Sequence, residues 1–109
     1  MSEVFRKYLE MIKRFNEVTS QERINPTEAK VLMALYDAKA ISTKTGLTLG
    51  KIMDRVKDGY SWSTYSVAVT GLEKEGYITK SIGEEDERQR VLCLTPKGVE
   101  NCKTLEGKL

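Results

Sequence analysis

The sequence predicts a mainly α-helical domain that carries one small β-hairpin. Most of the chain places apolar residues at the 3.6-residue spacing of helices. The stretch from Gly76 to Gly98 instead holds two short runs rich in β-branched, aromatic and aliphatic residues. With 109 residues, 39% of them hydrophobic and 31% charged, the chain has the size and composition of one folded domain. Residues 1–109 are therefore treated as a single domain.

The hairpin is predicted from the runs Tyr77–Ile82 and Arg90–Leu94. The intervening residues 83–89 carry no apolar side chain, as expected of a solvated turn. A two-stranded hairpin is only marginally stable alone, so we expect this one to pack on helices. Residues 76–95 are called the wing below.

Two helices are expected before residue 40. Residues 1–20 follow a helical spacing of apolar side chains, with Ser2 as the N-cap. This stripe either covers the core of its own chain or forms an interface with a second subunit. The second helix begins with Asn25 as N-cap and Pro26 at the first helical position. The candidate dimerisation residues of the first helix are Phe5, Leu9 and Ile12.

Residues 48–75 predict two helices joined by a turn. Thr48 can cap a short helix that runs to about Lys57, and Asp58-Gly59 is a turn signal. Ser61 can cap a second helix that Gly76 ends. Two short helices joined in this way form a helix-turn-helix, whose second helix fits the major groove of DNA.

The exposed face of this second helix is predicted to carry small side chains. It lacks arginine, lysine, asparagine and glutamine, which make the strong bidentate contacts to bases. We therefore expect modest base discrimination, with phosphate contacts and DNA shape contributing more. The alternative is an ordinary helix with a solvated face. The candidate DNA-contacting residues are Ser61, Ser63, Thr64, Ser66, Val67 and Thr70.

The tip of the wing supplies two further candidates, Arg88 and Arg90. An arginine at a hairpin tip suits the narrow minor groove, where the negative potential is strongest. Asp86 is close enough in sequence to hold the Arg88 guanidinium in one orientation. The alternative is a solvated turn with weak surface ion pairs. We expect the neighbouring carboxylates to point away from phosphates; they are Glu84, Glu85 and Glu87.

A last helix is predicted from Pro96 to the end of the chain. Its apolar stripe requires a partner, either the first helix or the same helix of a second subunit. Because a residue near a two-fold axis meets its own copy, a Cys102–Cys102 bridge between subunits is one candidate. A buried free thiol is the alternative, and Cys93 is interpreted as structural. The candidate dimerisation residues of this helix are Val99, Cys102 and Leu105.

Composition argues against an enzyme and against a metal site. The chain has no histidine, and its two cysteines cannot form a metal site alone. It shows no glycine-rich phosphate loop and no nucleophile–base arrangement. We therefore expect no catalytic residue, metal or cofactor. No apolar run approaches a membrane span and no secretory signal is visible, so we expect a cytoplasmic protein.

Charge alone does not identify a partner, because 18 basic residues face 16 acidic ones for a net charge of +2. Any contact with a polyanion has to come from local geometry.

The motifs of the wing nevertheless resemble a known family, the MarR-type winged-helix transcriptional regulators. Asp86-x-Arg88, followed after five residues by Leu94-Thr95-x-x-Gly98, is similar to their wing signature. Leu72-Glu-Lys-Glu-Gly-Tyr-Ile78 is similar to their exit from the recognition helix. The likeness covers roughly residues 24–98 and includes the starts of the helices at Asn25 and Thr48.

The resemblance implies a homodimer that binds a pseudo-palindromic operator in double-stranded DNA. It places the helix of residues 61–75 in the major groove and Arg88 in the minor groove. It also assigns dimerisation to the terminal helices, residues 1–20 and 96–109. Only 13 residues follow Pro96, and in this compactness the chain resembles small archaeal or archaeal-virus regulators. The sequence identifies no small-molecule effector. The competing function is a winged helix that binds another protein without binding DNA.

Overall fold

The computed structural model describes residues 2–83 and 86–109. In this part of the chain it contains five helices and one two-stranded antiparallel sheet. The predicted fold class, mainly α with a small hairpin, is confirmed. The elements, in chain order, are α1 Glu3–Gln21, α2 Pro26–Asp37, α3 Leu49–Val56, α4 Trp62–Lys74, β1 Ile78–Ile82, β2 Arg90–Leu94 and α5 Pro96–Lys108.

Each helix begins at an N-cap side chain that accepts a hydrogen bond from a backbone N–H of the first turn. The bond satisfies one of the donors that a helix start leaves free, which typically stabilises it by about 1 kcal/mol. At α2 the cap is reciprocal, because Asn25 accepts from the Glu28 amide at 2.8 Å and Glu28 accepts from the Asn25 amide at 3.1 Å. Four of these caps were predicted, namely Ser2, Asn25, Thr48 and Ser61, and Thr95 is the cap of α5.

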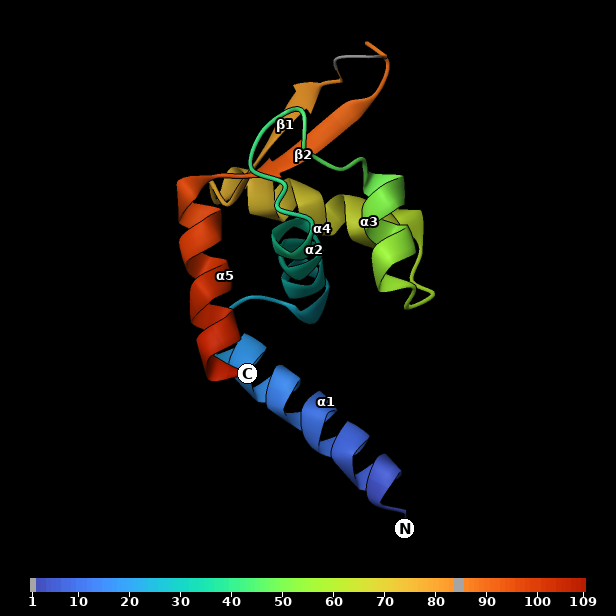
Figure 1. Ribbon diagram of the computed structural model, residues 1–109, viewed down its shortest axis with the longest axis vertical. Coiled ribbons are helices and arrows are strands. Elements are labelled where there is room, and N and C mark those ends of the chain that lie inside the picture. The colour runs from blue at the N-terminus through green and yellow to red at the C-terminus, as the bar shows by residue number, and fades with distance from the viewer. Residues whose placement is uncertain (1, 84–85) are drawn as a thin grey trace.

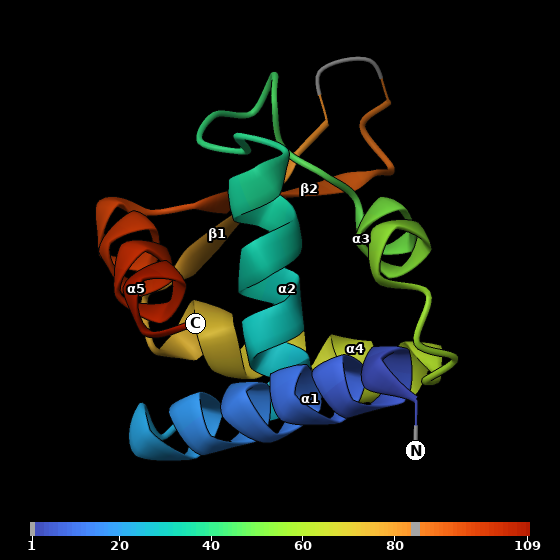
Figure 2. The ribbon, with the colours of Figure 1, turned by 60° about the horizontal axis from the view of Figure 1, so that its bottom comes forward.

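Helix α2 is the centre of the molecule. It contacts every other helix as well as β2, and Figures 1 and 2 show α4 crossing behind it, with α3 and α5 on opposite sides. Its side chains Leu32 and Leu35 are fully buried. Tyr65 from α4 and Ile52 from α3 are fully buried in the same core. The helix-turn-helix is therefore held against a rigid apolar base.

The wing packs on this helical body through a third chain segment. β1 pairs with β2 from Ile78↔Leu94 to Ile82↔Arg90. On the other side of β2, Leu47 exchanges two backbone hydrogen bonds with Leu92, at 3.0 and 2.8 Å. Gly76 joins α4 to β1 with a φ of +81°, a left-handed conformation that glycine adopts without strain. The hairpin thus receives the support that it needs.

Helix α1 projects from the body (Figure 1) and gives the chain a long axis of 51 Å. Only its last turns enter the core, where Val18 and Thr19 are buried. Near the end of α5, Arg14 Nε donates to the Lys108 carbonyl at 2.9 Å, and Lys108 forms an ion pair with Glu22. The first half of α1 leaves an apolar face uncovered.

Candidate nucleic-acid interface

The two faces of α4 divide as the sequence predicts. Tyr65, Ala68, Val69 and Leu72 are buried against the body. The opposite face carries small side chains, and the exposed fraction of Val67 is 72%. The predicted contact residues on this helix and its cap are all exposed; they are Ser61, Ser63, Thr64, Ser66, Val67 and Thr70. Another molecule can approach this face closely because the side chains that it carries from Ser61 to Thr70 are short.

Some hydroxyls of this face are already used within α4. The Ser61 hydroxyl accepts from the Thr64 amide at 3.3 Å, and the two hydroxyls lie 3.1 Å apart. Thr70 donates its hydroxyl to the Ser66 carbonyl at 3.0 Å. These bonds orient the side chains and leave acceptor lone pairs on the hydroxyl oxygens for a ligand. Ser63, Thr64 and Val67 also line a shallow groove between α4 and the start of α2.

The wing tip presents Arg88 with 93% of its side chain exposed. Asp86 accepts a bond from the Arg88 amide at 2.9 Å and one from its Nε at 3.4 Å, both on Oδ1. Asp86 therefore braces Arg88, as predicted. An exposed pair of this kind adds little stability, so its effect is mainly on orientation.

Arg90 has a different environment from Arg88. Its Nη1 donates to the carbonyls of Glu87, at 3.0 Å, and Gln89, at 3.3 Å. The side chain therefore folds back on the wing tip, although it stays exposed and keeps further guanidinium donors. The expected orientation of Glu84 and Glu85 lies outside the described residues.

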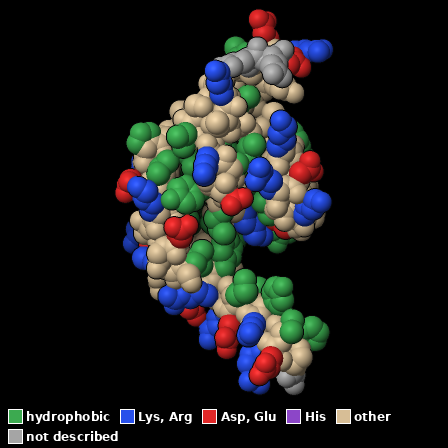
Figure 3. All heavy atoms as spheres, viewed as in Figure 1, with side chains coloured by type: hydrophobic (Ala, Val, Ile, Leu, Met, Phe, Trp, Pro, Cys, Tyr) green, Lys and Arg blue, Asp and Glu red, His purple; other side chains and the backbone are tan. Residues whose placement is uncertain are grey.

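Sequence reasoning gave no role to the cations of α3. Lys51 and Arg55 are exposed on this helix, which packs beside α4, and Figure 3 shows basic side chains gathered over α3. Arg55 Nη1 lies 3.4 Å from Asp37 Oδ2 in an exposed ion pair. The sequence hid this cluster because nearby acidic residues balance its charge along the chain.

Sequence reasoning also missed a polar network behind the start of α4. Asp58, in the α3–α4 turn, accepts the Tyr65 hydroxyl at 2.7 Å and Lys30 Nζ at 3.1 Å, both on Oδ2. Its Oδ1 accepts the Tyr60 amide at 3.2 Å. Burial acts to raise the pKa of Asp58, but the three hydrogen bonds prevail and lower it. Burial and then the bond to Asp58 raise the pKa of Tyr65. The carboxylate is therefore charged and the phenol neutral at physiological pH.

The predicted dimerisation residues separate into two groups. On α1, Phe5, Leu9 and Ile12 are exposed to 65, 54 and 56%. On α5, Cys102 and Leu105 are only 3 and 2% exposed. Val99 is partly buried against the same core.

The expected dimerisation stripe of α5 is therefore wrong for Cys102 and Leu105. Both face the core of their own chain, because α5 packs on α2, α1 and β2. The sequence had left this possibility open, since the stripe required either the first helix or a second subunit. A Cys102–Cys102 bridge is contradicted for the same reason. The Cys102 thiol donates to the Leu32 carbonyl at 3.5 Å inside the core. Cys93 is also buried, and its thiol donates to the Ser42 carbonyl at 3.0 Å.

Both thiols are expected to be unreactive in the folded protein. Burial, followed by the charge of Glu106, raises the pKa of the Cys102 thiol to about 11, and burial also raises the pKa of Cys93. The reactive thiolate is therefore scarce at pH 7.5 and increases as the pH rises. Maleimide labelling followed by mass spectrometry should be slow until urea is added. A disulfide-linked dimer on a non-reducing gel that is absent in Cys102→Ser would contradict this assignment.

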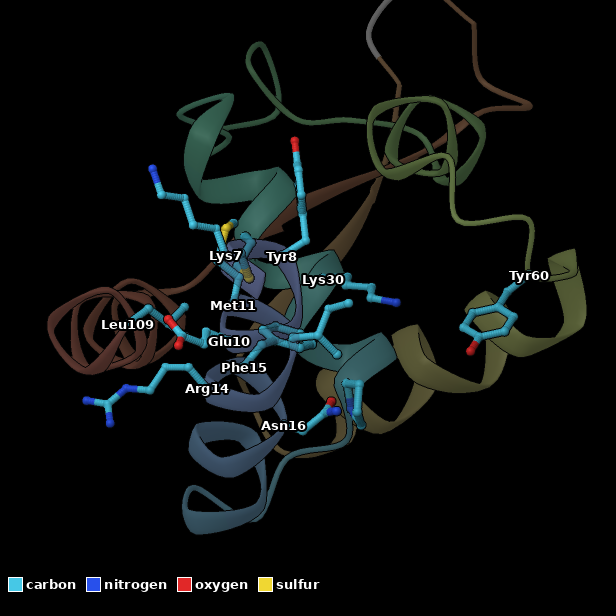
Figure 4. Close-up of a pocket in the computed structure, with 13 residues that line it drawn as sticks. Lys7, Tyr8, Glu10, Met11, Arg14, Phe15, Asn16, Lys30, Tyr60 and Leu109 are labelled. Atoms are coloured by element: carbon cyan, nitrogen blue, oxygen red, sulfur yellow. The ribbon is translucent and has the colours of Figure 1, made fainter. Parts of the chain in front are cut away.

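A hollow of about 970 Å³ lies where α1 leaves the body. Figure 3 shows it as a notch with hydrophobic side chains on its walls, and Figure 4 shows side chains of α1, α2 and the α3–α4 turn around it. Its lining residues are Lys7, Tyr8, Glu10, Met11, Ile12, Arg14, Phe15, Asn16, Pro26, Lys30, Met33, Tyr60 and Leu109. Uncovered apolar side chains of α1 form much of this wall.

Metal sites and membrane spans are two further features that bear on function. Among residues 2–83 and 86–109, no three histidine, cysteine, aspartate or glutamate side chains gather in a way that could hold a metal ion. None of the helices within the same ranges is both long and apolar enough to cross a membrane.

Comparison with known proteins supports the fold and points to a family. The family described as "Transcriptional regulator SarA/Rot" matches residues 13–105. No curated protein sequence matches the chain. Among solved structures, S. aureus MepR in its DNA-binding conformation has a TM-score of 0.79 and 22% identity. The match covers 96% of this chain and 73% of MepR.

Two further structures extend this likeness. The S. aureus MepR–DNA complex has a TM-score of 0.71 and 23% identity, with 98% of this chain and 82% of that one covered. A MarR-family transcriptional regulator from Silicibacter pomeroyi has a TM-score of 0.71 and 21% identity, with 88% and 59% covered. The predicted MarR-type winged helix-turn-helix is thereby confirmed. The likeness to archaeal regulators stays a prediction.

Proposed function

Because the chain belongs to the SarA/Rot family of transcriptional regulators, which are not enzymes, we propose that it binds double-stranded DNA as a homodimer. In this proposal α4 enters the major groove and the wing tip reaches the adjacent minor groove. Both elements are anchored to the body, because α4 packs on α2 and β2 pairs with β1 on one side and with Leu47 on the other.

The observation that carries the proposal is the pairing of an unobstructed helix face with an oriented arginine. α4 exposes small side chains along one face, and the wing follows directly from its C-terminal end (Figure 1). At the wing tip Arg88 is almost fully exposed and held by Asp86. Arginine is favoured in narrow minor grooves because the negative potential is strongest there. S. aureus MepR, which shares this fold, has been solved in complex with DNA.

The homodimer is proposed from α1. Its first half exposes Phe5, Leu9 and Ile12 beyond the body, and Tyr8 is 61% exposed beside them. An apolar face of this width on a projecting helix is unusual for a monomer and indicates a protein interface. Two copies joined by α1 would present two copies of α4 to the two halves of a pseudo-palindromic site. We propose that α5 supports the dimer only indirectly, by packing against α1 of its own chain. In this proposal Cys102 takes no part in the interface.

DNA binding is tested by selecting duplexes from a random pool and titrating the protein with the selected sequence. The affinity should fall steeply with salt, because lysine and arginine contacts release counterions. Arg88→Ala should weaken binding by about tenfold and reduce the salt slope by about one contact. Lys103→Ala serves as the control for charge, because Lys103 lies on α5 and pairs with Glu100 at 3.5 Å.

The groove that Arg88 enters can be identified with modified bases. Inosine·C and G·C pairs look alike in the major groove and differ in the minor groove by the amino group of guanine. Under the proposed wing position, the wild-type protein should prefer inosine·C to G·C, and Arg88→Ala should not distinguish them. If no duplex is retained from the pool even at low salt, the protein-binding alternative replaces DNA binding.

A further inference from the structure

The Asp58 carboxylate joins the turn of the helix-turn-helix to α4 and to α2 at one point. It lies in the turn between α3 and α4, and it accepts bonds from Lys30 of α2, from Tyr65 of α4 and from the Tyr60 amide of the turn itself. The Asp58 side chain is 17% exposed and Tyr65 is fully buried. Hydrogen bonds to a buried charge are stronger than those between neutral groups.

The residues around this turn make little apolar contact with the core. Lys57 ends α3 in a left-handed conformation, with φ 50° and ψ 46°, a conformation typical of helix C-termini. Tyr60 and Trp62, on either side of the α4 cap, are 55 and 59% exposed. Apolar packing therefore holds α4 from Tyr65 onward but not the exposed residues at its start, Ser61 to Thr64.

Lys30 completes the attachment from the side of α2. Its Nζ lies 5.1 Å from the centre of the Tyr60 ring, a cation–π distance, while it pairs with Asp58. Figure 4 shows Lys30 reaching from α2 toward the turn that carries Tyr60. Loss of the carboxylate would remove the acceptor that Lys30 shares with the buried Tyr65 phenol, and with it the bonds that tie the turn to α2 and α4.

We propose that Asp58 is a positioning residue for DNA recognition: it fixes the first turn of α4, and so the depth and angle at which Ser61, Ser63 and Thr64 meet the bases. The inference rests on the proposed function. The side chain of Asp58 does not touch DNA in this scheme. It acts by holding the helix start in one orientation, which matters because contacts to base edges require placement within a fraction of an ångström.

The test compares Asp58→Asn with Asp37→Asn. Both substitutions remove one negative charge and one ion pair, but the Asp37–Arg55 pair is exposed, with Asp37 at 83%. The readout is the ratio of the affinities for the selected duplex and for a scrambled duplex at the same salt. Asp58→Asn should lower this ratio by about tenfold, the size of one lost base contact, and should leave the affinity for scrambled DNA unchanged. Asp37→Asn should change neither affinity.

Thermal unfolding of each variant separates positioning from loss of fold, and binding is measured well below every midpoint. Tyr65→Phe is the second variant, because it removes only the phenol hydroxyl and leaves the Lys30–Asp58 pair in place. It should lower the ratio in the same direction by a smaller factor. If the wild type binds its duplex and every folded variant has the wild-type affinity ratio, the role of Asp58 is overturned but the proposed function is not. A wild-type protein that binds no duplex overturns the proposed function as well.

Discussion

Replacing Leu9 and Ile12 together by glutamate is expected to convert the protein from a dimer into a monomer. Both side chains are more than half exposed on the projecting part of α1. Two carboxylates placed inside an apolar interface would have to be desolvated without partners, which costs several kcal/mol. Sedimentation equilibrium at micromolar concentration measures the change directly.

The same double variant should bind the selected duplex at least a hundredfold more weakly. A dimer engages two half-sites, so its second contact benefits from a high effective concentration that a monomer loses. Lys7→Glu is the matched control. It also changes the net charge by two units, but Lys7 is exposed and lies two residues before Leu9 and five before Ile12, on the other side of α1 from both. A wild-type protein that sediments as a monomer at high micromolar concentration would refute the proposed dimer.

The helix starts could be predicted because their causes are local. An N-cap acts on backbone groups two or three residues away, so Asn25, Thr48 and Ser61 identify helix starts without knowledge of the fold. The glycine at position 76 is local in the same sense, since it relieves a backbone conformation. The wing brace is local too, because Asp86 and Arg88 are two residues apart.

What covers an apolar face could not be predicted from its spacing. The stripe of α1 and the stripe of α5 look alike in sequence, yet Leu105 is buried in its own chain and Leu9 is exposed. Periodicity shows that a helix has an apolar side, but the partner of that side depends on the tertiary arrangement. The assignment of Cys102 to a subunit interface was wrong for this reason.

Contacts between residues far apart in sequence were equally hidden. Lys30 and Asp58 are 28 residues apart, and nothing in the spacing of either residue indicates that they meet. In sequence Asp58-Gly59 is only a turn signal. The contact between Leu47 and β2 is another example, because a single bridge leaves no alternating pattern to read. These contacts position the helix-turn-helix and the wing. The sequence therefore predicted the helices and strands of the candidate interface, but not the long-range contacts that hold them in place.

Gly98→Ala is expected to destabilise the protein by about 3 kcal/mol, the upper range for forcing atoms into a packed site. Gly98 lies in the first turn of α5 and is buried. A Cβ on it would lie 2.0 Å from the Tyr77 carbonyl oxygen and 3.1 Å from the Tyr77 carbonyl carbon. These are backbone atoms at the start of the wing, and the same oxygen accepts the Thr95 amide at 3.1 Å. The obstruction therefore cannot be relieved by a rotamer change.

The expected drop in the thermal unfolding midpoint is on the order of 10–20 °C for a chain of this size. Gly107→Ala is the control in the same helix, because nothing lies within 4 Å of its added Cβ, and it should be neutral or stabilising by up to about 1 kcal/mol. Gly98 closes the Leu94-Thr95-x-x-Gly98 motif, so the clash gives that motif a physical cause: α5 and the start of the wing approach too closely for a side chain. Equal midpoints for the two variants would show that α5 can move away from the wing, and the close approach would then not be what requires glycine.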